Sequence, residues 1–148
     1  MKTKNQKVTK ELNGLLADYQ IYYQNLRGLH WNVKGALFFS LHEKYEQYYN
    51  EAAEVVDEIA ERILMLGGQP LHTFGDYLKA ASLKEVADVS DGVEGVKTVL
   101  NSSVYFLEKF QQIMALAAEN KDEGTVAMMS EWIGATEKRI WMLESFLS

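Results

Sequence analysis

The sequence predicts an all-α protein, a four-helix bundle with one long crossover, and three observations indicate this class. Apolar residues recur at spacings of three and four along four long segments. The only proline is Pro70, so a helix can run unbroken on either side of it. The chain has 148 residues, of which 47% are hydrophobic, and this is enough for one domain with its own core.

The first two predicted helices occupy the N-terminal half of the chain. The first ends at Gly35, and the second ends at Gly67 and Gly68 with Pro70 just beyond, which is a common way for a helix to stop. The apolar positions of the first are Val8, Leu12, Leu15, Tyr19, Tyr22, Leu26, Leu29 and Val33. Those of the second are Leu41, Tyr45, Tyr48, Ala52, Val56, Ile59, Ile63 and Leu66.

The other two predicted helices occupy the C-terminal half. The third opens with Asp91-x-x-Glu94, which resembles a capping box. Its apolar positions are Val93, Val96, Leu100, Leu107, Phe110 and Met114. Those of the fourth are Val126, Met129, Trp132, Ile133, Ile140, Leu143 and Phe146.

The connection between the second and third helices, residues 67–90, is unusually long. A short helix is predicted at residues 77–81, and Ser82-x-x-Glu85 offers another capping-box start. Ferritin-like bundles are among those with one long crossover, so we predict a ferritin-like four-helix bundle whose crossover carries a short extra helix. Residues 1–148 are predicted to form one domain, with residues 1–10 as a short lysine-bearing tail.

Composition and charge narrow the classes of function. The chain has no cysteine, which excludes disulfides, thiolate metal sites and cysteine nucleophiles. The formal net charge is −6 although residues 1–10 contain four lysines and no acid, so the body of the protein is strongly acidic. The start of the chain lacks the apolar stretch of a signal peptide, and no run approaches the ~18 apolar residues of a membrane span. We therefore expect a soluble cytoplasmic protein.

Metal-ligand residue types occupy one flank of the second predicted helix. His42 and Glu46 are four residues apart and share a face, as do Asp57 and Glu61. Eleven residues separate Glu46 from Asp57, roughly 16 Å at about 1.5 Å per residue. A metal–ligand bond is only about 2 Å long, so one metal cannot bind both pairs of one straight helix. An antiparallel partner chain could bring one chain's histidines to the other chain's carboxylates, which predicts an oligomer with metal sites at its interfaces.

Each of these residues also has a simpler interpretation when taken alone. His30 lies among apolar residues and would be a hydrogen-bonded core histidine. Asp57 and Glu61 would belong to a solvated helix face, and Trp31 would serve packing. Only the joint pattern favours a metal site.

Two segments resemble the Dps miniferritins, the bacterial DNA-protection-during-starvation proteins. They are LHWNVKGALFFSLH at residues 29–42 and VDEIAERI at residues 56–63. The family pattern is HW, a second histidine twelve residues on, an acid four residues later, and then DEIAER. This chain carries all of it, and the resemblance extends over nearly its full length. At Glu46 many members have Asp.

The resemblance implies a shell of twelve subunits that oxidises Fe(II), usually with hydrogen peroxide, and stores ferric iron as a mineral in its cavity. His30 and His42 would come from one subunit and Asp57 and Glu61 from its two-fold mate, with Glu46 as a ligand of the second metal. Ordinary ferritins instead use a Glu-x-x-His site inside each bundle, and that motif is absent from this sequence.

Imidazole and carboxylate ligands suit Fe(II), but also Zn(II), Mn(II) and Co(II). A store for zinc or manganese with slow iron chemistry therefore remains an alternative. Trp31, next to His30, would either donate electrons and trap radicals near the site or serve only packing.

Two further sets of acidic residues are candidates for roles in iron handling. Glu51, Glu54 and Glu58 lie on a third, acidic face of the second helix, and we hypothesise that they line the cavity and nucleate the mineral. The resemblance also implies acidic residues at three-fold iron-entry pores near the turn before the fourth helix. Asp122 and Glu123 are the candidates there.

DNA binding is a hypothesis of a different class. Some members of the family bind DNA through a lysine-bearing tail and others do not; here Lys2, Lys4, Lys7 and Lys10 are the candidates. Phosphate contacts would make such binding strongly salt-dependent, and the acidic body opposes it. An early start of the first helix would instead hold the lysines against the body. The alternative function is thus a nucleoid-compacting structural protein with weak or no ferroxidase activity.

Overall fold

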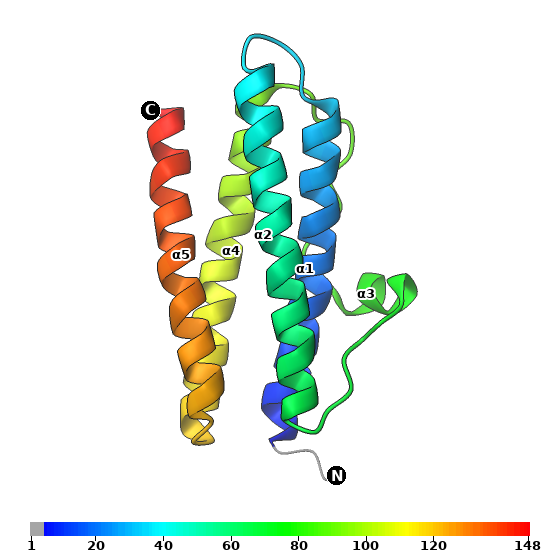
Figure 1. Ribbon diagram of the computed structural model, residues 1–148, viewed down its shortest axis with the longest axis vertical. Helices are drawn as coiled ribbons and strands as arrows, with labels where there is room; N and C mark the ends of the chain where they lie inside the picture. Colours follow the sequence, from blue (N-terminus) through cyan, green and yellow to red (C-terminus); the bar gives the residue numbers. More distant parts are fainter. Residues whose placement is uncertain (1–4) are drawn as a thin grey trace.

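Four long helices run side by side, and a fifth, short helix stands outside them on the crossover (Figure 1). The computed structural model describes residues 5–148, and within this range it contains no strand. The helices are α1 (Gln6–Asn32), α2 (Phe38–Met65), α3 (Phe74–Ala80), α4 (Gly92–Glu119) and α5 (Glu123–Leu147). The predicted all-α bundle of four long helices, with a short helix on the crossover, is confirmed.

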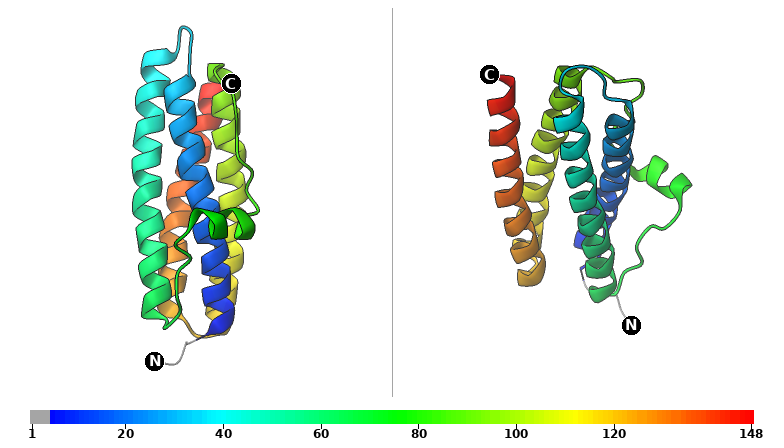
Figure 2. Two further views of the ribbon diagram at one scale, coloured as in Figure 1. Left: turned by 90° about the vertical axis from the view of Figure 1, so that its right-hand side faces the viewer. Right: turned by 45° about the horizontal axis from the view of Figure 1, so that its top comes forward.

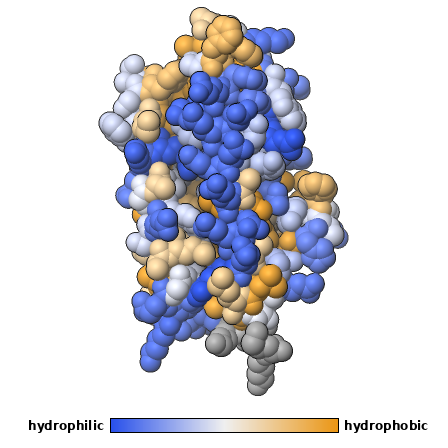
Figure 3. Space-filling model, viewed as in Figure 1, coloured by the Kyte–Doolittle hydropathy of each residue, from blue (hydrophilic) through white to orange (hydrophobic). Residues whose placement is uncertain are grey.

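The helices pack as two hairpins, α1 with α2 and α4 with α5, joined by the long crossover (Figure 2). Aromatic rings fill the space between the hairpins: the ring centroid of Tyr19 lies 4.3 Å from that of Phe106 and 6.1 Å from that of Phe110. Figure 3 shows a largely hydrophilic face along α2, with hydrophobic side chains at the end where α1 and α2 are joined. Phe39 is 85% exposed there.

The N-terminal segment is helical earlier than predicted. Asn5 caps α1 by accepting a hydrogen bond from the Val8 amide, and Val8 is fully buried. Of the predicted tail, residues 6–10 therefore belong to α1, and Lys7 and Lys10 are exposed on that helix. Lys2 and Lys4 lie outside the described residues.

The other helix ends largely follow the predictions. The Asp91 side chain accepts from the Glu94 amide at 2.9 Å and begins α4. α2 ends at Met65, just before Gly67, whose φ of +82° is a conformation that glycine adopts without strain. α1 ends at Asn32, before the predicted Gly35, which lies in the connecting loop with a φ of +103°.

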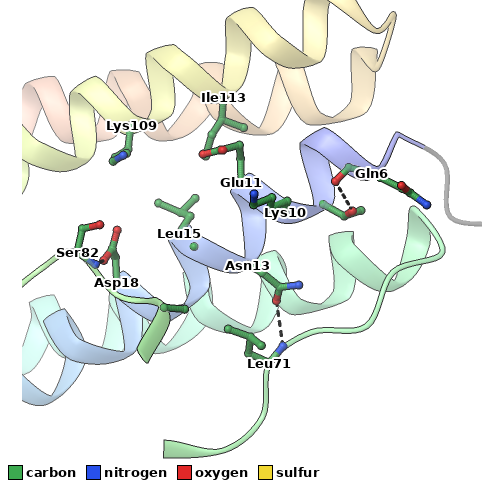
Figure 4. Close-up of a pocket in the computed structure, with 13 residues that line it drawn as sticks. Gln6, Lys10, Glu11, Asn13, Leu15, Asp18, Leu71, Ser82, Lys109 and Ile113 are labelled. Atoms are coloured by element: carbon green, nitrogen blue, oxygen red, sulfur yellow. Dashed lines mark hydrogen bonds between the residues drawn. The ribbon is translucent and has the colours of Figure 1, made fainter. Parts of the chain in front are cut away.

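The crossover is held to α1 by side chains of that helix. Asp18 Oδ1 accepts hydrogen bonds from the Ser82 and Leu83 amides at 2.7 and 2.9 Å, and Oδ2 accepts from the Tyr105 hydroxyl. The Leu71 amide donates to Asn13 at the edge of a cavity of about 620 Å³ (Figure 4). The short crossover helix is confirmed, starting at Phe74 rather than residue 77.

The predicted helix start at Ser82-x-x-Glu85 is wrong. This segment is not helical: Asp18 accepts hydrogen bonds from the Ser82 and Leu83 amides, and the Ser82 amide is one that a capping box would have used. None of the helices in the described range has an apolar stretch long enough to span a bilayer.

Candidate metal centre

His30, in the last turn of α1, and His42, in the first turns of α2, form a reciprocal pair. The His30 Nδ1 lies 2.5 Å from the backbone oxygen of His42, and the His42 Nδ1 lies 2.7 Å from the backbone oxygen of His30. Their rings stack with centroids 3.7 Å apart and an interplanar angle of 11°. Each histidine is thus oriented by the other's main chain.

This arrangement determines the tautomer of both rings. A carbonyl oxygen can only accept, so each Nδ1 must carry a hydrogen, and each neutral ring keeps its lone pair on Nε2. A backbone carbonyl at the other ring nitrogen is a typical second partner of a metal-binding histidine. His30 is therefore a buried, hydrogen-bonded histidine whose Nε2 could still bind a metal. The two interpretations of His30 from the sequence, as a core histidine and as a ligand, are compatible.

Glu46 lies beside His30, and the three residues His30, His42 and Glu46 form one candidate half-site. Its Oε1 lies 3.8 Å from His30 Nε2, so a carboxylate faces a nitrogen lone pair across a short gap. Two electron-pair donors in this position are stabilised by a cation between them. The donor set, imidazole with carboxylate, fits Fe(II) and other divalent first-row metals.

Aromatic side chains hold this half-site in place. Phe38 stacks on His42 at 4.9 Å, and Tyr49 meets the His30 ring edge-to-face at 5.3 Å. The Tyr49 hydroxyl also donates to Glu46 Oε1 at 3.4 Å. Tyr49 was missing from the predicted site, although its position three residues after Glu46 on the same flank could have indicated it.

Trp31 lies beside the half-site but on the surface. Its side chain is 57% exposed, and the Arg27 guanidinium lies 4.8 Å from its ring centroid. The same guanidinium lies 5.4 Å from the Tyr23 ring. Trp31 is thus held by a cation–π contact and is not part of the core.

Asp57 and Glu61 form a second, separate candidate half-site further along α2. Both are exposed, and they lie close enough to interact. A hydrogen bond with Asp57, and then the negative charge of Asp57, raise the pKa of the Glu61 carboxyl. Within residues 5–148 of one chain, no three His, Asp or Glu side chains converge on a single metal position. The structure brings His30, His42 and Glu46 together, and Asp57 with Glu61.

The acidic residues predicted to nucleate mineral lie exposed on α2. Together with Glu131 of α5, they line a groove of about 190 Å³ between the two helices. They are Glu51, Glu54 and Glu58. Glu51 is also 3.8 Å from the guanidinium of Arg139.

The two pore candidates differ in their surroundings. Asp122 caps α5 through the Thr125 amide and hydroxyl, and its Oδ1 receives Arg62 Nη2 at 2.6 Å. Burial raises the pKa of Asp122, but the hydrogen bonds from Thr125 and Arg62 outweigh it, so the net pKa lies below the ordinary 3.8. Glu123 is exposed in the first turn of α5. Asp122 therefore positions the turn, and Glu123 faces solvent.

Comparison with known proteins places this chain in a defined family. The family described as a ferritin-like domain matches residues 9–148. A DNA protection during starvation protein from Porphyromonas gingivalis is 45% identical over 139 residues, covering 94% of this chain and 87% of that protein. A second protein of that name, from Brevibacillus brevis, is 39% identical over 148 residues and 99% of each chain.

Solved structures agree with this class. The Dps protein from Vibrio cholerae, described as a member of a broad superfamily of ferritin-like diiron-carboxylate proteins, superposes with a TM-score of 0.96. It is 41% identical, with 100% of this chain and 99% of that chain covered. The chain belongs to the Dps miniferritin family.

Proposed function

We propose that this protein is a ferroxidase that oxidises Fe(II), preferably with hydrogen peroxide, and stores the ferric product as a mineral inside a dodecameric shell. The observation that carries the proposal is the reciprocal tie between His30 and His42, which leaves the lone pair of each ring on Nε2, with that of His30 3.8 Å from the Glu46 carboxylate. The description of the Vibrio cholerae relative as a diiron-carboxylate superfamily member supports iron as the substrate.

The site would be completed between two-fold related subunits. Asp57 lies eleven residues beyond Glu46 on the same helix, roughly 16 Å along its axis, so the two half-sites of one chain cannot share a metal. An antiparallel second α2 would place the carboxylates of one subunit against the histidines of its mate. A two-fold axis would generate two equivalent sites in each dimer.

The ligands suit a two-electron reduction of peroxide. Two Fe(II) each give one electron to hydrogen peroxide; the O–O bond breaks, two protons are taken up, and two waters and two Fe(III) result. No hydroxyl radical is released when both electrons arrive at the same peroxide. The carboxylates of Asp57, Glu61 and Glu46 favour the more highly charged ferric product, which assists the loss of electrons.

Other residues would serve entry, storage and radical capture. Glu123 would present its carboxylate at an iron-entry pore while Asp122 holds the turn. Ferric iron would then collect in the acidic groove of α2 and α5, where Glu54 and Glu58 are exposed. Trp31, at the surface next to His30, would supply an electron when only one iron is bound.

DNA binding is the second candidate, favoured by the names of the relatives and by the exposure of Lys7 and Lys10. Because α1 holds both lysines, they would contact DNA from the surface of that helix. A gel shift at low salt, repeated with Lys7→Gln/Lys10→Gln, tests it. No retardation of DNA by the wild type would exclude the nucleoid-compacting role.

The ferroxidase is tested by mixing apo protein with Fe(II) without oxygen, adding hydrogen peroxide and following ferric absorbance. Asp57→Asn/Glu61→Gln should oxidise at the background rate, whereas Glu43→Gln/Glu144→Gln, which removes the same charge from exposed positions, should match the wild type. Equal slow rates in all three proteins would reject the proposal. Tight Zn(II) or Mn(II) binding with that slow rate would favour the metal-store alternative.

A further inference from the structure

A positively charged side chain lies inside the helical bundle. Arg139 of α5 is only 12% exposed, and its Nη2 lies 3.8 Å from the Glu51 carboxylate. Its guanidinium also lies 5.7 Å from the Tyr48 ring centroid. Within residues 5–148, the buried Nη1 has no hydrogen-bond partner. A buried guanidinium with incomplete pairing is costly, so its retention calls for an explanation.

Arg139 lies in the lining of the acidic groove between α2 and α5. This groove also contains Tyr19 and the carboxylates of Glu51, Glu54, Glu58 and Glu131, and among its described lining residues Arg139 carries the only positive charge. Four carboxylates attract cations, but a cation that moves inward would meet the fixed charge of the guanidinium. Like charges repel strongly where water is scarce.

Oxygen-bearing side chains from two other helices surround Arg139. Ferritin-like bundles build metal sites from inward-facing oxygen and nitrogen donors of facing helices. Here the oxygens around the guanidinium are those of the Glu51 carboxylate and of the phenols of Tyr19, Tyr22 and Tyr48, from α1 and α2. Burial raises the pKa of Tyr48 to about 12, so this phenol would act as a neutral oxygen donor.

We propose that Arg139 occupies a latent cation site inside the bundle and excludes metal ions from it by its own charge. The cations concerned are hard ones with oxygen ligands, such as Mn(II) or a trivalent lanthanide. In the iron-oxidising protein this exclusion would confine iron to the interface and the cavity. That last consequence rests on the proposed function, whereas the latent site does not.

The test measures binding of Tb(III), whose emission is excited through nearby tyrosines. It uses chains that also carry Asp57→Asn/Glu61→Gln, so that the interface carboxylates do not contribute. Adding Arg139→Gln should create one more bound Tb(III) per chain, with tyrosine-excited emission. Adding Glu51→Gln to that variant should abolish the gain. Lys138→Gln, which removes the same charge from the exposed neighbouring position, should leave the number of sites unchanged.

An unchanged number of sites in a folded Arg139→Gln protein would overturn the proposal, as would an equal gain from Lys138→Gln. Arg139→Lys keeps the charge and should show no gain. If Arg139→Gln does not fold, Arg139→Met is tested instead. If neither variant folds, the helical circular dichroism signal is measured after Tb(III) is added. Recovery of that signal supports the site, and no recovery contradicts it. Iron oxidation is not measured, so a failure here leaves the ferroxidase proposal untouched.

Discussion

His30 and His42 each donate a hydrogen bond through Nδ1 to the other's backbone oxygen, which ties the end of α1 to the start of α2. The tie uses Nδ1 of each ring, whereas the proposed metal-binding role would use Nε2. Substitutions can therefore separate the two.

The first prediction concerns His42→Asn and His42→Leu. An asparagine amide can still donate to the His30 carbonyl, so His42→Asn should keep the unfolding free energy within about 1 kcal/mol of the wild type. His42→Leu leaves that carbonyl unpaired and should cost about 1–3 kcal/mol. Both variants lack the Nε2 ligand and should lose rapid iron oxidation.

Chemical denaturation and the peroxide assay together check this prediction. A His42→Asn protein that oxidises iron at the wild-type rate would show that His42 is not a ligand. Equal stability of the Asn and Leu variants would show that the carbonyl contact contributes little.

The second prediction concerns Asp18, which anchors the crossover. Asp18→Ala removes the acceptor for the Ser82 and Leu83 amides and for the Tyr105 hydroxyl. Hydrogen bonds to a charged group contribute about 1.5–3 kcal/mol each, so we expect a loss of about 3 kcal/mol or more. Hydrogen exchange should accelerate at residues 82 and 83, and unchanged protection there would contradict the anchoring role.

The sequence predicted what depends on local spacing. The Asp91 cap and the stop near Gly67 follow from residues within a few positions of one another, whereas His30 and Glu46 of the predicted cluster are sixteen positions apart. The two helix ends are set by local geometry, which a periodic pattern reveals directly. The grouping of His30 with His42 was instead implied by the resemblance to the Dps family.

Contacts between distant segments could not be predicted in this way. Asp18 reaches residues 82 and 83 more than sixty positions away, and it overrides the helix start that Ser82-x-x-Glu85 suggested. The burial of Arg139 and its approach to Glu51 likewise depend on how α5 packs against α2. The neighbouring sequence of Asp18 and of Arg139 does not distinguish either residue from an ordinary charged surface residue.

The third prediction is the pH dependence of the contact between Arg62 and Asp122. The pKa of Asp122 is lowered in the folded protein, so this carboxylate stabilises the fold above its unfolded pKa of 3.8, and the contribution disappears as the pH falls through the lower folded value. Asp122→Asn should therefore lower the unfolding free energy by about 2 kcal/mol at neutral pH. The difference from the wild type should shrink below pH 3.8.

Urea unfolding from pH 7 down to pH 2.5 follows this difference. Glu123→Gln, which removes the neighbouring exposed carboxylate, serves as the control and should differ little from the wild type at any pH. If the difference in unfolding free energy between the wild type and Asp122→Asn increased as the pH falls, this explanation would be contradicted.

The fourth prediction compares two glycines of α5. A Cβ at Gly124 would lie 2.5 Å from Arg62 Nη2, whereas a Cβ at Gly134 meets nothing within 4 Å. Gly124→Ala should displace the Arg62 guanidinium and cost about 1–2 kcal/mol, since overpacking forces a shift. Gly134→Ala should stabilise the helix by about 0.5–1 kcal/mol. Thermal unfolding of both variants tests this prediction. Equal shifts of the unfolding midpoint in the two variants would contradict the close packing at Arg62.

The central claim is that one subunit supplies the histidines and its two-fold mate supplies the carboxylates. The most direct measurement refolds together two inactive chains, one with His30→Gln/His42→Asn and the other with Asp57→Asn/Glu61→Gln. A mixed dimer would contain one site with every native ligand, so random pairing should restore about a quarter of the wild-type iron oxidation with peroxide. Co-assembled shells that remain as inactive as either parent would contradict the claim.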